Sequence, residues 1–280
     1  MNCVKIDNKI VAENKALISV KERGFLFGDG VFETCRIFDK KIYNWQAHLK
    51  RLEAGLQAVK IKAKINDLEE QAAELIAKNS IKEGILRIYI SRGIGSSGYL
   101  PSSNMKPLIV IETKALPSLP KAPISLWVSK TTKPSANSLP VNYKLAQGLN
   151  STLARIEAVD NDCFDSLLLN DLDQICETSS ANIFWVKNDI LYTPDENCGL
   201  LLGTVRQRII ELSLLKVVKV KAKLKDLLLA DEVFITNVSF GVLAIDNIMP
   251  NNYSFINRKY GKIYADLLNK DIISYVAQNN

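Results

Sequence analysis

The sequence predicts a mixed α and β fold arranged as two domains. Segments in which apolar and polar residues alternate, as they do along half-buried strands, are interspersed with segments in which apolar residues recur at helical spacing. Three prolines lie within the eight residues 116–123, and such a stretch is typical of a linker. We therefore expect an N-terminal α/β domain over residues 1–115, an interdomain linker over 116–122 and a C-terminal α/β domain over 123–280.

Each element of the N-terminal half has its own signal. Residues 4–11 alternate and turn at Asp7-Asn8, which predicts a strand that folds back on itself. A glycine-punctuated turn then leads into a strand that ends near Phe38, and a tight turn after it forms a hairpin. Two helices are expected over residues 46–59 and 67–78, and two further strands over 86–91 and 108–112.

The C-terminal half continues the same mixture of elements. Strands are expected at residues 125–129, 166–169, 182–186 and 232–236, and helices near Ser151, Thr204 and Gly261. The densest basic run, residues 216–225, alternates lysines with apolar residues. This alternation favours a half-exposed strand over a nucleic-acid-binding patch.

Composition places the chain among ordinary globular proteins. A hydrophobic content of 47% in 280 residues supports a substantial core. The net charge of +6 comes from 36 basic and 30 acidic residues that are interspersed along the chain. This mild positive balance favours an anionic substrate or cofactor and gives no sign of a nucleic-acid partner.

Several classes of protein are disfavoured by particular residues. The five cysteines include no CxxC pair, which argues against a disulfide framework and against a zinc site. The single histidine, His48, leaves no cluster of histidine metal ligands. No apolar run approaches the roughly twenty residues of a membrane span, and the start lacks the pattern of a signal peptide. We therefore expect a cytoplasmic protein with no metal and no membrane partner.

Three polar signals lie where the apolar pattern breaks, and together they describe a cofactor site. Lys144 follows an extended apolar approach, Glu177 precedes a run of small residues and a strand, and Gly203-Thr204 opens a helix. Free N–H groups at a helix start suit a phosphate. A lysine can form a Schiff base, and a glutamate can hold a protonated ring nitrogen. These demands describe pyridoxal 5′-phosphate.

Each of these signals alone has a commoner explanation. Surface lysines are usually solvated, a glutamate at the end of a strand is usually exposed, and Gly-Thr before a helix is usually only a cap. Their order and spacing are more specific. On these motifs the chain resembles, from about Ile18 to Ile245, the class IV pyridoxal-phosphate enzymes of fold type IV, such as branched-chain and D-amino-acid aminotransferases and aminodeoxychorismate lyases.

The resemblance implies roles for individual residues. Lys144 would form the Schiff base and carry protons, and Glu177 would pair with the pyridinium nitrogen. The run His48-Leu49-Lys50-Arg51 matches the helical motif whose arginine binds the cofactor phosphate. The remaining phosphate contacts would come from Thr204 and Val205, and from Thr236 and Asn237 in a second loop. All of these residues except Arg51 fall in the expected C-terminal, cofactor-binding domain.

Differences among the family members favour one reaction. The Arg-x-His pair typical of D-amino-acid aminotransferases is replaced by Arg92-Gly93-Ile94, and the Phe-Glu-Gly of branched-chain aminotransferases by Phe32-Glu33-Thr34. The first hairpin and the loop that ends at Tyr99 are most similar to aminodeoxychorismate lyase. In that enzyme a hydroxyl at the position of Thr34 is thought to assist proton movement.

The implied reaction converts 4-amino-4-deoxychorismate to 4-aminobenzoate and pyruvate, on the route to folate. Arg92, Ser97 and Tyr99 are the expected substrate-binding residues. Lyases usually carry an arginine where this chain has Ser97, and Arg92, Arg87 or Arg36 could supply the missing cation. An aminotransferase acting on branched-chain or D-amino acids with a 2-oxo acid acceptor is the alternative.

The resemblance also implies a homodimer with the active site at the subunit interface. The apolar residues Phe25, Leu26 and Phe27 in the N-terminal hairpin are candidates for that contact. Packing within one subunit is the commoner fate of such residues.

Overall fold

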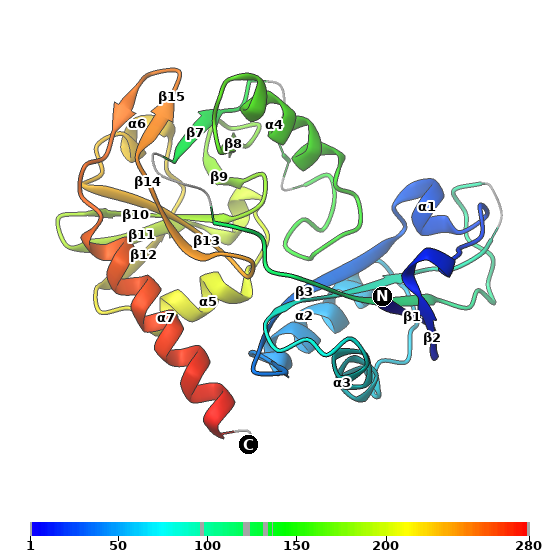
Figure 1. The fold of residues 1–280 in the computed structure, drawn as a ribbon. Helices are drawn as coiled ribbons and strands as arrows, with labels where there is room; N and C mark the ends of the chain where they lie inside the picture. The colour runs from blue at the N-terminus through cyan, green and yellow to red at the C-terminus, as the bar shows by residue number, and fades with distance from the viewer. Residues whose placement is uncertain (1, 96–97, 120–123, 131–133, 136, 279–280) are drawn as a thin grey trace. The chain divides into compact units, whose positions relative to one another are not determined.

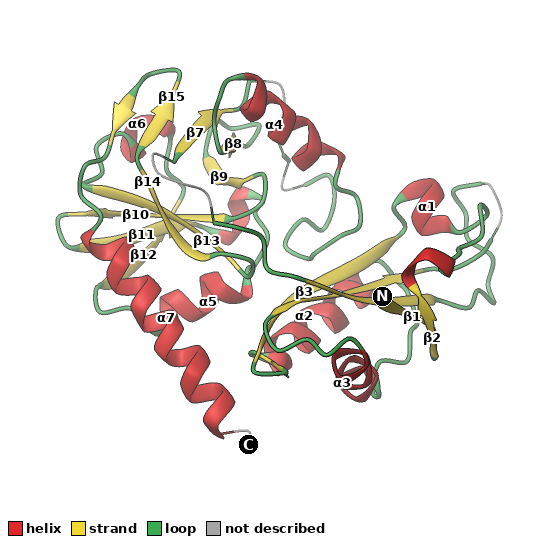
Figure 2. Cartoon of the chain, viewed as in Figure 1, coloured by secondary structure: helices red, strands yellow, loops and turns green. Residues whose placement is uncertain are grey.

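The computed structural model describes residues 2–95, 98–119, 124–130, 134–135 and 137–278 (Figure 1). The chain divides into two compact units. Unit 1 contains Met1–Leu116, Tyr143–Gly148 and Ile272–Asn280, and unit 2 contains Pro117–Asn142 and Leu149–Asp271. Both units combine helices with sheets (Figure 2), so the α+β class predicted from the sequence is confirmed.

Unit 1 is built on one six-stranded sheet in which every pairing is antiparallel, in the order β2-β1-β6-β5-β3-β4. Its strands are β1 (Cys3–Ile6), β2 (Lys9–Ala12), β3 (Gly30–Phe38), β4 (Lys41–Ile42), β5 (Gly84–Ser91) and β6 (Leu108–Lys114). Its helical elements are η1 (Glu13–Lys15), α1 (Arg23–Phe27), α2 (Trp45–Ala58) and α3 (Leu68–Lys78).

The core of unit 1 lies between this sheet and the helices α2 and α3. Along β3, Val31, Cys35 and Ile37 are buried and join the core, while Phe32 and the other alternate residues are only partly buried. Successive side chains of a strand point to opposite faces. Apolar packing therefore covers one face of the sheet. The other face carries Phe32 and the other half-buried side chains of β3.

Unit 2 contains two five-stranded sheets, with the orders β12-β11-β10-β13-β14 and β16-β15-β7-β8-β9. The strands are β7 (Ser125–Val128), β8 (Asp165–Leu169), β9 (Ile175–Thr178), β10 (Asn182–Lys187), β11 (Ile190–Pro194), β12 (Lys216–Val220), β13 (Glu232–Asn237), β14 (Gly241–Ile245), β15 (Asn247–Met249) and β16 (Tyr253–Ser254). The helical elements that begin in unit 2 are α4 (Leu149–Asp160), η2 (Glu196–Cys198), α5 (Thr204–Glu211), α6 (Leu224–Leu227) and α7 (Lys259–Gln278).

Helices α5 and α7 lie along the sheet that contains β13 (Figure 1). The ring of Tyr264 in α7 packs 5.4 Å from that of Phe234 in β13, measured between centroids. The Arg208 side chain of α5 bonds both carboxylate oxygens of Asp271 in α7. The last turn of α5 is therefore tied to α7.

The expected helices and strands are present with small shifts at their ends. The helices expected at 46–59 and 67–78 are α2 and α3, because their apolar residues recur at the spacing that buries one face. The strand expected over 216–225 is shorter. It ends at Val220, and the chain then forms the short helix α6, whose first turn is closed by a bond from the Lys223 backbone N–H to the Asp226 carboxylate.

The segment Tyr143–Gly148 belongs to unit 1, although the sequence analysis placed Lys144 in the C-terminal domain. Its backbone pairs with the first residues of β3. The Phe32 N–H donates to the Lys144 carbonyl over 2.9 Å, and the Ala146 N–H donates to the Gly30 carbonyl over 2.9 Å. Backbone pairing of this kind cannot be read from either segment alone. The expected linker includes residues 120–122, which lie outside the described residues.

Over the part of the chain that the structure describes, no helix combines the length and the apolar character needed to cross a membrane.

Candidate active site

The sequence-predicted site residues are divided between the two units. Lys144, Thr34 and Arg51 lie in unit 1, and Glu177 and Thr204 lie in unit 2.

In unit 1, Lys144 lies over an aromatic ring on the open face of the sheet. Its Nζ is 4.4 Å from the centroid of the Phe32 ring, a geometry in which a cation is attracted to the ring face. The Phe32 ring stacks on Tyr89 at 5.2 Å, and the Arg87 guanidinium is 5.5 Å from both ring centroids. Lys144 and Arg87 are thus both gathered around Phe32.

Thr34 lies on the same face, because it is two residues from Phe32 along β3. Its cross-strand partner in β5 is Arg87, so a hydroxyl and a guanidinium are neighbours there. Arg36, the next residue on this face, bonds Glu83 at 3.0 Å. Its buried Nε has no hydrogen-bond partner among the described residues.

The opposite face of β3 carries a buried polar cluster. Glu33 accepts hydrogen bonds from Arg51 Nε and Nη2, both at 2.7 Å, and its Oε2 lies 2.8 Å from His48 Nδ1. Burial by itself would raise the pKa of Glu33, but Arg51 and then His48 lower that pKa to about 2. Arg51 is thus held by a fixed carboxylate, which orients its guanidinium.

Glu33, Cys35 and His48 also offer three possible metal ligands, with ligand atoms within 4.8 Å of one another. Both oxygens of Glu33 are already bonded to Arg51. Burial raises the pKa of the Cys35 thiol, which disfavours the thiolate that a metal would need. We therefore assign no metal to this cluster.

In unit 2, Glu177 lies in β9 with both carboxylate oxygens engaged. Oε1 accepts from the Leu201 N–H at 3.2 Å, and Oε2 accepts from Asn182 Nδ2 at 3.1 Å. Asn182, at the start of β10, was not singled out in the sequence. The one signal it gives is its position between a run of small residues and an apolar strand.

Thr204 and Val205 begin helix α5, and both are buried. The residue before them, Gly203, has no side chain to cap the first N–H groups of the helix. Thr236 of β13 is 1% exposed, and its hydroxyl has no hydrogen-bond partner among the described residues. Thr236 is the cross-strand partner of Asn182, which also packs against Gly203. A buried hydroxyl without a partner among the described residues, close to the start of a helix, fits a phosphate.

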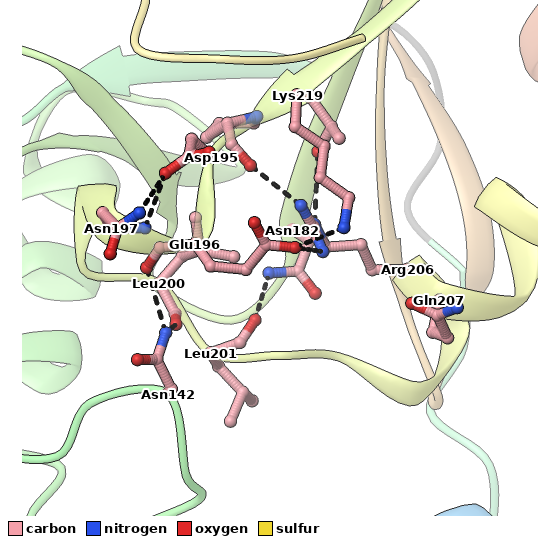
Figure 3. A network of polar contacts seen from close by, with 12 residues as sticks. Asn142, Asn182, Asp195, Glu196, Asn197, Leu200, Leu201, Arg206, Gln207 and Lys219 are labelled. Carbon is pink, nitrogen blue, oxygen red and sulfur yellow. Dashed lines mark hydrogen bonds and ion pairs between the residues drawn. The ribbon is translucent and has the colours of Figure 1, made fainter. Parts of the chain in front are cut away.

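The loop that leads into α5 is fixed by buried side chains (Figure 3). Arg206, 2% exposed, donates to the Pro194 carbonyl at 2.8 Å and forms an ion pair with Glu196 at 3.6 Å. Burial lowers the pKa of Arg206, and Glu196 opposes that shift. Asn142 donates to the carbonyls of Glu196 and Leu200 at 3.1 and 2.9 Å. The sequence analysis missed Arg206 as a residue that positions the first turn of α5.

Asn237, expected to contact phosphate, uses its side chain in a turn. Its Oδ1 accepts from the backbone N–H groups of Ser239 and Phe240, and its Nδ2 donates to the Ser180 carbonyl. These bonds leave the second N–H of Asn237 Nδ2 for contact with a ligand.

The residues expected to bind substrate are Arg92, Ser97 and Tyr99. The Arg92 guanidinium bonds both carboxylate oxygens of Asp29 and the carbonyls of Val59 and Lys60. Its donors are engaged within the protein, which argues against a role in holding a substrate carboxylate. Tyr99 is exposed, with its ring 5.6 Å from that of Phe27. Ser97 lies outside the described residues.

Comparison with known proteins identifies the family. The family model described as "Amino-transferase class IV" matches residues 30–248, and the chain belongs to that family. An aminodeoxychorismate lyase of Bacillus subtilis is 28% identical over 89% of this chain and 88% of its own length. A D-alanine aminotransferase of Listeria monocytogenes is 28% identical over 94% of this chain and 93% of its own. These relatives have different activities, so the family does not by itself select the reaction.

The fold predicted from the resemblance, fold type IV, is confirmed by solved structures. A branched-chain amino acid aminotransferase from T.th., crystallised with pyridoxamine 5′-phosphate, matches with a TM-score of 0.87. The match covers 97% of this chain and 94% of that protein at 22% identity.

The Glu33 cluster generates a prediction about pH. Burial lowers the pKa of His48, so the unfolded state binds a proton that the folded state does not as the pH falls below about 6.5. We expect His48 to lower the free energy of unfolding by up to about 1.4 kcal/mol per pH unit in that window. Glu33, with a folded pKa of about 2 against an ordinary 4.5, adds a second loss at lower pH. Urea unfolding followed by circular dichroism at several pH values measures both.

His48→Asn is the matched control for this measurement. Its amide nitrogen can still donate to Glu33 but does not titrate, so the loss that begins near pH 6.5 should disappear while the loss at lower pH remains. An unchanged pH dependence in His48→Asn would show that this histidine is not the titrating group.

Proposed function

We propose that this chain is a pyridoxal 5′-phosphate enzyme that acts as an aminodeoxychorismate lyase. It converts 4-amino-4-deoxychorismate to 4-aminobenzoate and pyruvate, a step in folate synthesis. The observation that carries the lyase assignment is the position of Thr34: a small hydroxyl residue on the sheet face that holds Phe32 beneath Lys144 Nζ, with Arg87 as its cross-strand neighbour.

The residues present fit this cofactor. The buried hydroxyl of Thr236, which has no partner among the described residues, and the start of α5 at Thr204 and Val205 are suited to a phosphate. Arg51, held by Glu33 through Nε and Nη2, would add a positive charge. Glu177 is a carboxylate with two fixed N–H donors, suited to holding a protonated ring nitrogen. A class IV relative of the same fold was crystallised with pyridoxamine 5′-phosphate, which supports the same choice.

The cofactor, when bound, supplies a conjugated ring that accepts the electron pair left at the amine-bearing carbon. Residues of this chain carry out the proton transfers. Lys144 Nζ takes the proton from that carbon. The C–O bond to the enolpyruvyl group breaks, and the departing enolpyruvate gains a proton to become pyruvate. The hydroxyl of Thr34 is the group on the same sheet face that can pass a proton to or from Lys144. No amino acceptor enters this balance.

Arg87 is the cation that best replaces the arginine missing at Ser97. Its guanidinium is part of the group around Phe32, and its ion-pair contact with Glu112 is long, at 3.8 Å. Arg92, in contrast, is committed to Asp29. A guanidinium on the open face can meet a substrate carboxylate with two parallel hydrogen bonds.

The alternative function is a class IV aminotransferase acting on branched-chain or D-amino acids with a 2-oxo acid acceptor. It is favoured by the D-alanine aminotransferase relative, which is as similar as the lyase of Bacillus subtilis. The two functions differ in whether the cofactor is converted to its amine form during turnover.

A two-way assay tests the proposed function. Purified protein loaded with pyridoxal 5′-phosphate should release pyruvate and 4-aminobenzoate from 4-amino-4-deoxychorismate, and D- or L-amino acids should not convert the cofactor to the pyridoxamine form. Lys144→Ala should lose at least about 10² to 10⁴-fold in rate, because it removes the proton-transferring amine. Rapid conversion by one class of amino acid without pyruvate release would make the chain an aminotransferase.

A second prediction concerns the substrate anion. Arg87→Met keeps the apolar stem but removes the charge, so KM for 4-amino-4-deoxychorismate should rise about tenfold or more. Arg92→Met is the matched control. It should lower the melting temperature, because Asp29 loses one of its two arginine partners, and leave KM nearly unchanged. A rise in KM with Arg92→Met and not with Arg87→Met would reverse the assignment.

We also propose that the chain forms a homodimer. Helix α4 exposes an apolar stripe of Leu149, Leu153, Ile156 and Val159, although its opposite face, with Ala154 and Ala158, is buried. In unit 1, Phe25 and Leu26 are exposed as well, together with Leu17, Ile18 and Val20. Exposed apolar stripes of this kind mark interaction sites.

The dimer has its own test. Light scattering should give the mass of two chains, and the double variant Leu153→Glu with Ile156→Glu should give the mass of one, because two charges would be buried without partners. Leu229→Glu, at an exposed leucine outside the stripe, is the control and should remain a dimer. A monomeric unaltered protein would contradict the proposal.

A cytoplasmic location stays a prediction. It is supported by the five cysteines, all of which carry free thiols, as is usual in a reducing compartment.

A further inference from the structure

We propose that Asn182 is a positioning residue that sets Glu177 and the start of helix α5 in one fixed arrangement. This inference rests on the cofactor assignment of the proposed function. Asn182 does not contact the reacting atoms. It determines the positions of Glu177 and of the start of α5, two groups that hold the cofactor in that assignment. The proposal follows from three sets of contacts made by this one buried side chain.

The first set uses both hydrogens of the Asn182 amide. Nδ2 donates to Glu177 Oε2 at 3.1 Å and to the Leu201 carbonyl at 2.8 Å (Figure 3 shows the second bond). A primary amide nitrogen has two N–H donors, so its donor capacity is filled. The residue is 4% exposed, and water therefore competes little for these bonds.

The second set closes a ring of three groups. The Leu201 N–H donates to Glu177 Oε1 at 3.2 Å, while the Leu201 carbonyl accepts from Asn182. Each of the three groups, the carboxylate, the amide and the peptide of Leu201, thus bonds to both of the others. N–H donors to both oxygens fix the plane of the carboxylate.

The third set reaches the proposed phosphate site. A Cβ atom added at Gly203 would lie 2.0 Å from Asn182 Oδ1, so the amide oxygen packs directly on the residue before α5. Gly203 has φ −66° and ψ 137°, which any residue can adopt. The need for glycine there comes from Asn182 and not from the backbone. The backbone of Asn182 is also paired with Thr236 across β10 and β13.

Asn182 therefore contacts, in one residue, the candidate partner of the ring nitrogen, the loop before α5 and the strand that carries the orphan hydroxyl. Loss of its amide would remove one donor from Glu177 and free the loop at Leu201. Replacement by aspartate would keep the shape but place a second carboxylate against Glu177, and like charges at that distance disfavour each other's ionised form.

The first experiment compares Asn182→Ala and Asn182→Asp with the unaltered enzyme. The readouts are the dissociation constant of pyridoxal 5′-phosphate, measured by titration of its visible absorbance, and the pH dependence of the bound cofactor's visible band. Both variants should bind the cofactor about tenfold or more weakly. Only Asn182→Asp should shift the pH midpoint of the band and recover affinity toward low pH, where its carboxyl is protonated and can donate again.

Asn170→Ala is the matched control. Asn170 is also a buried asparagine, and its Nδ2 donates to the carbonyl of Cys198 in the same loop, but its hydrogen bonds do not involve Glu177 or Gly203. Its loss should lower the melting temperature without weakening cofactor binding, whereas Asn182→Ala should weaken that binding about tenfold or more. A purely structural role for Asn182 would make the two asparagines behave alike, and that result would overturn the inference.

A double-mutant cycle tests the packing on Gly203 without the cofactor. Gly203→Ala should lower the melting temperature in the unaltered background, because the new methyl group meets Asn182 Oδ1. In the Asn182→Ala background the same change should cost much less, since the opposing atom is gone. Additive effects in the cycle would overturn the contact as the cause.

The outcomes also separate this inference from the proposed function. If the unaltered protein binds no pyridoxal 5′-phosphate, the proposed function fails, and the double-mutant cycle still reports on the packing. If the unaltered protein binds the cofactor while both Asn182 variants keep its affinity and pH profile, the proposed function stands and the positioning role of Asn182 is wrong.

Discussion

The alternation of side chains along β3 is the constraint on which the site in unit 1 depends. On one face, Val31, Cys35 and Ile37 pack in the core, and the Glu33 carboxylate is hydrogen-bonded to Arg51 and His48. The other face presents Phe32 and Thr34. Because the period of a strand is two, a slip of one residue would exchange these faces and bury the hydroxyl in place of the carboxylate. The sealed core therefore fixes which side chains can meet a ligand.

In unit 2, hydrogen bonds between buried polar groups hold the candidate site residues in place. Asn182 and Arg206 are almost fully buried, and both donate to carbonyls of the chain at residues 194–201. A buried polar group without a partner costs roughly 1–3 kcal/mol, so a loop that offers several carbonyls to buried donors has few other conformations available to it. The loop before α5 is thus rigid for an energetic reason, and the helix start it delivers is rigid with it.

Local pattern was sufficient to predict much of the fold, and it failed where partners are distant in sequence. The helices α2 and α3 were predicted because their apolar spacing is contained in one segment. Arg92 was expected to bind substrate as a replacement for the arginine missing at Ser97, whereas its partner Asp29 lies far away in the chain. Asn182 was missed for the same reason: an amide among small residues gives no sign of its bond to Leu201. Contacts between residues that are distant in sequence determine the geometry of a site. The pattern of a single segment does not reveal these contacts.

The lysines of residues 216–225 affect how separate copies of the chain associate with one another. Strand β12 is the outermost strand of its sheet, and its neighbour β11 pairs with it on one side only. An open edge can recruit a strand from another molecule and start aggregation. Lys216 and Lys219 are exposed on this edge, Lys219 is paired with Glu196, and bringing two such edges together would place the Lys216 charges near each other. The basic run that could be mistaken for a nucleic-acid patch thus disfavours the addition of another strand at this edge.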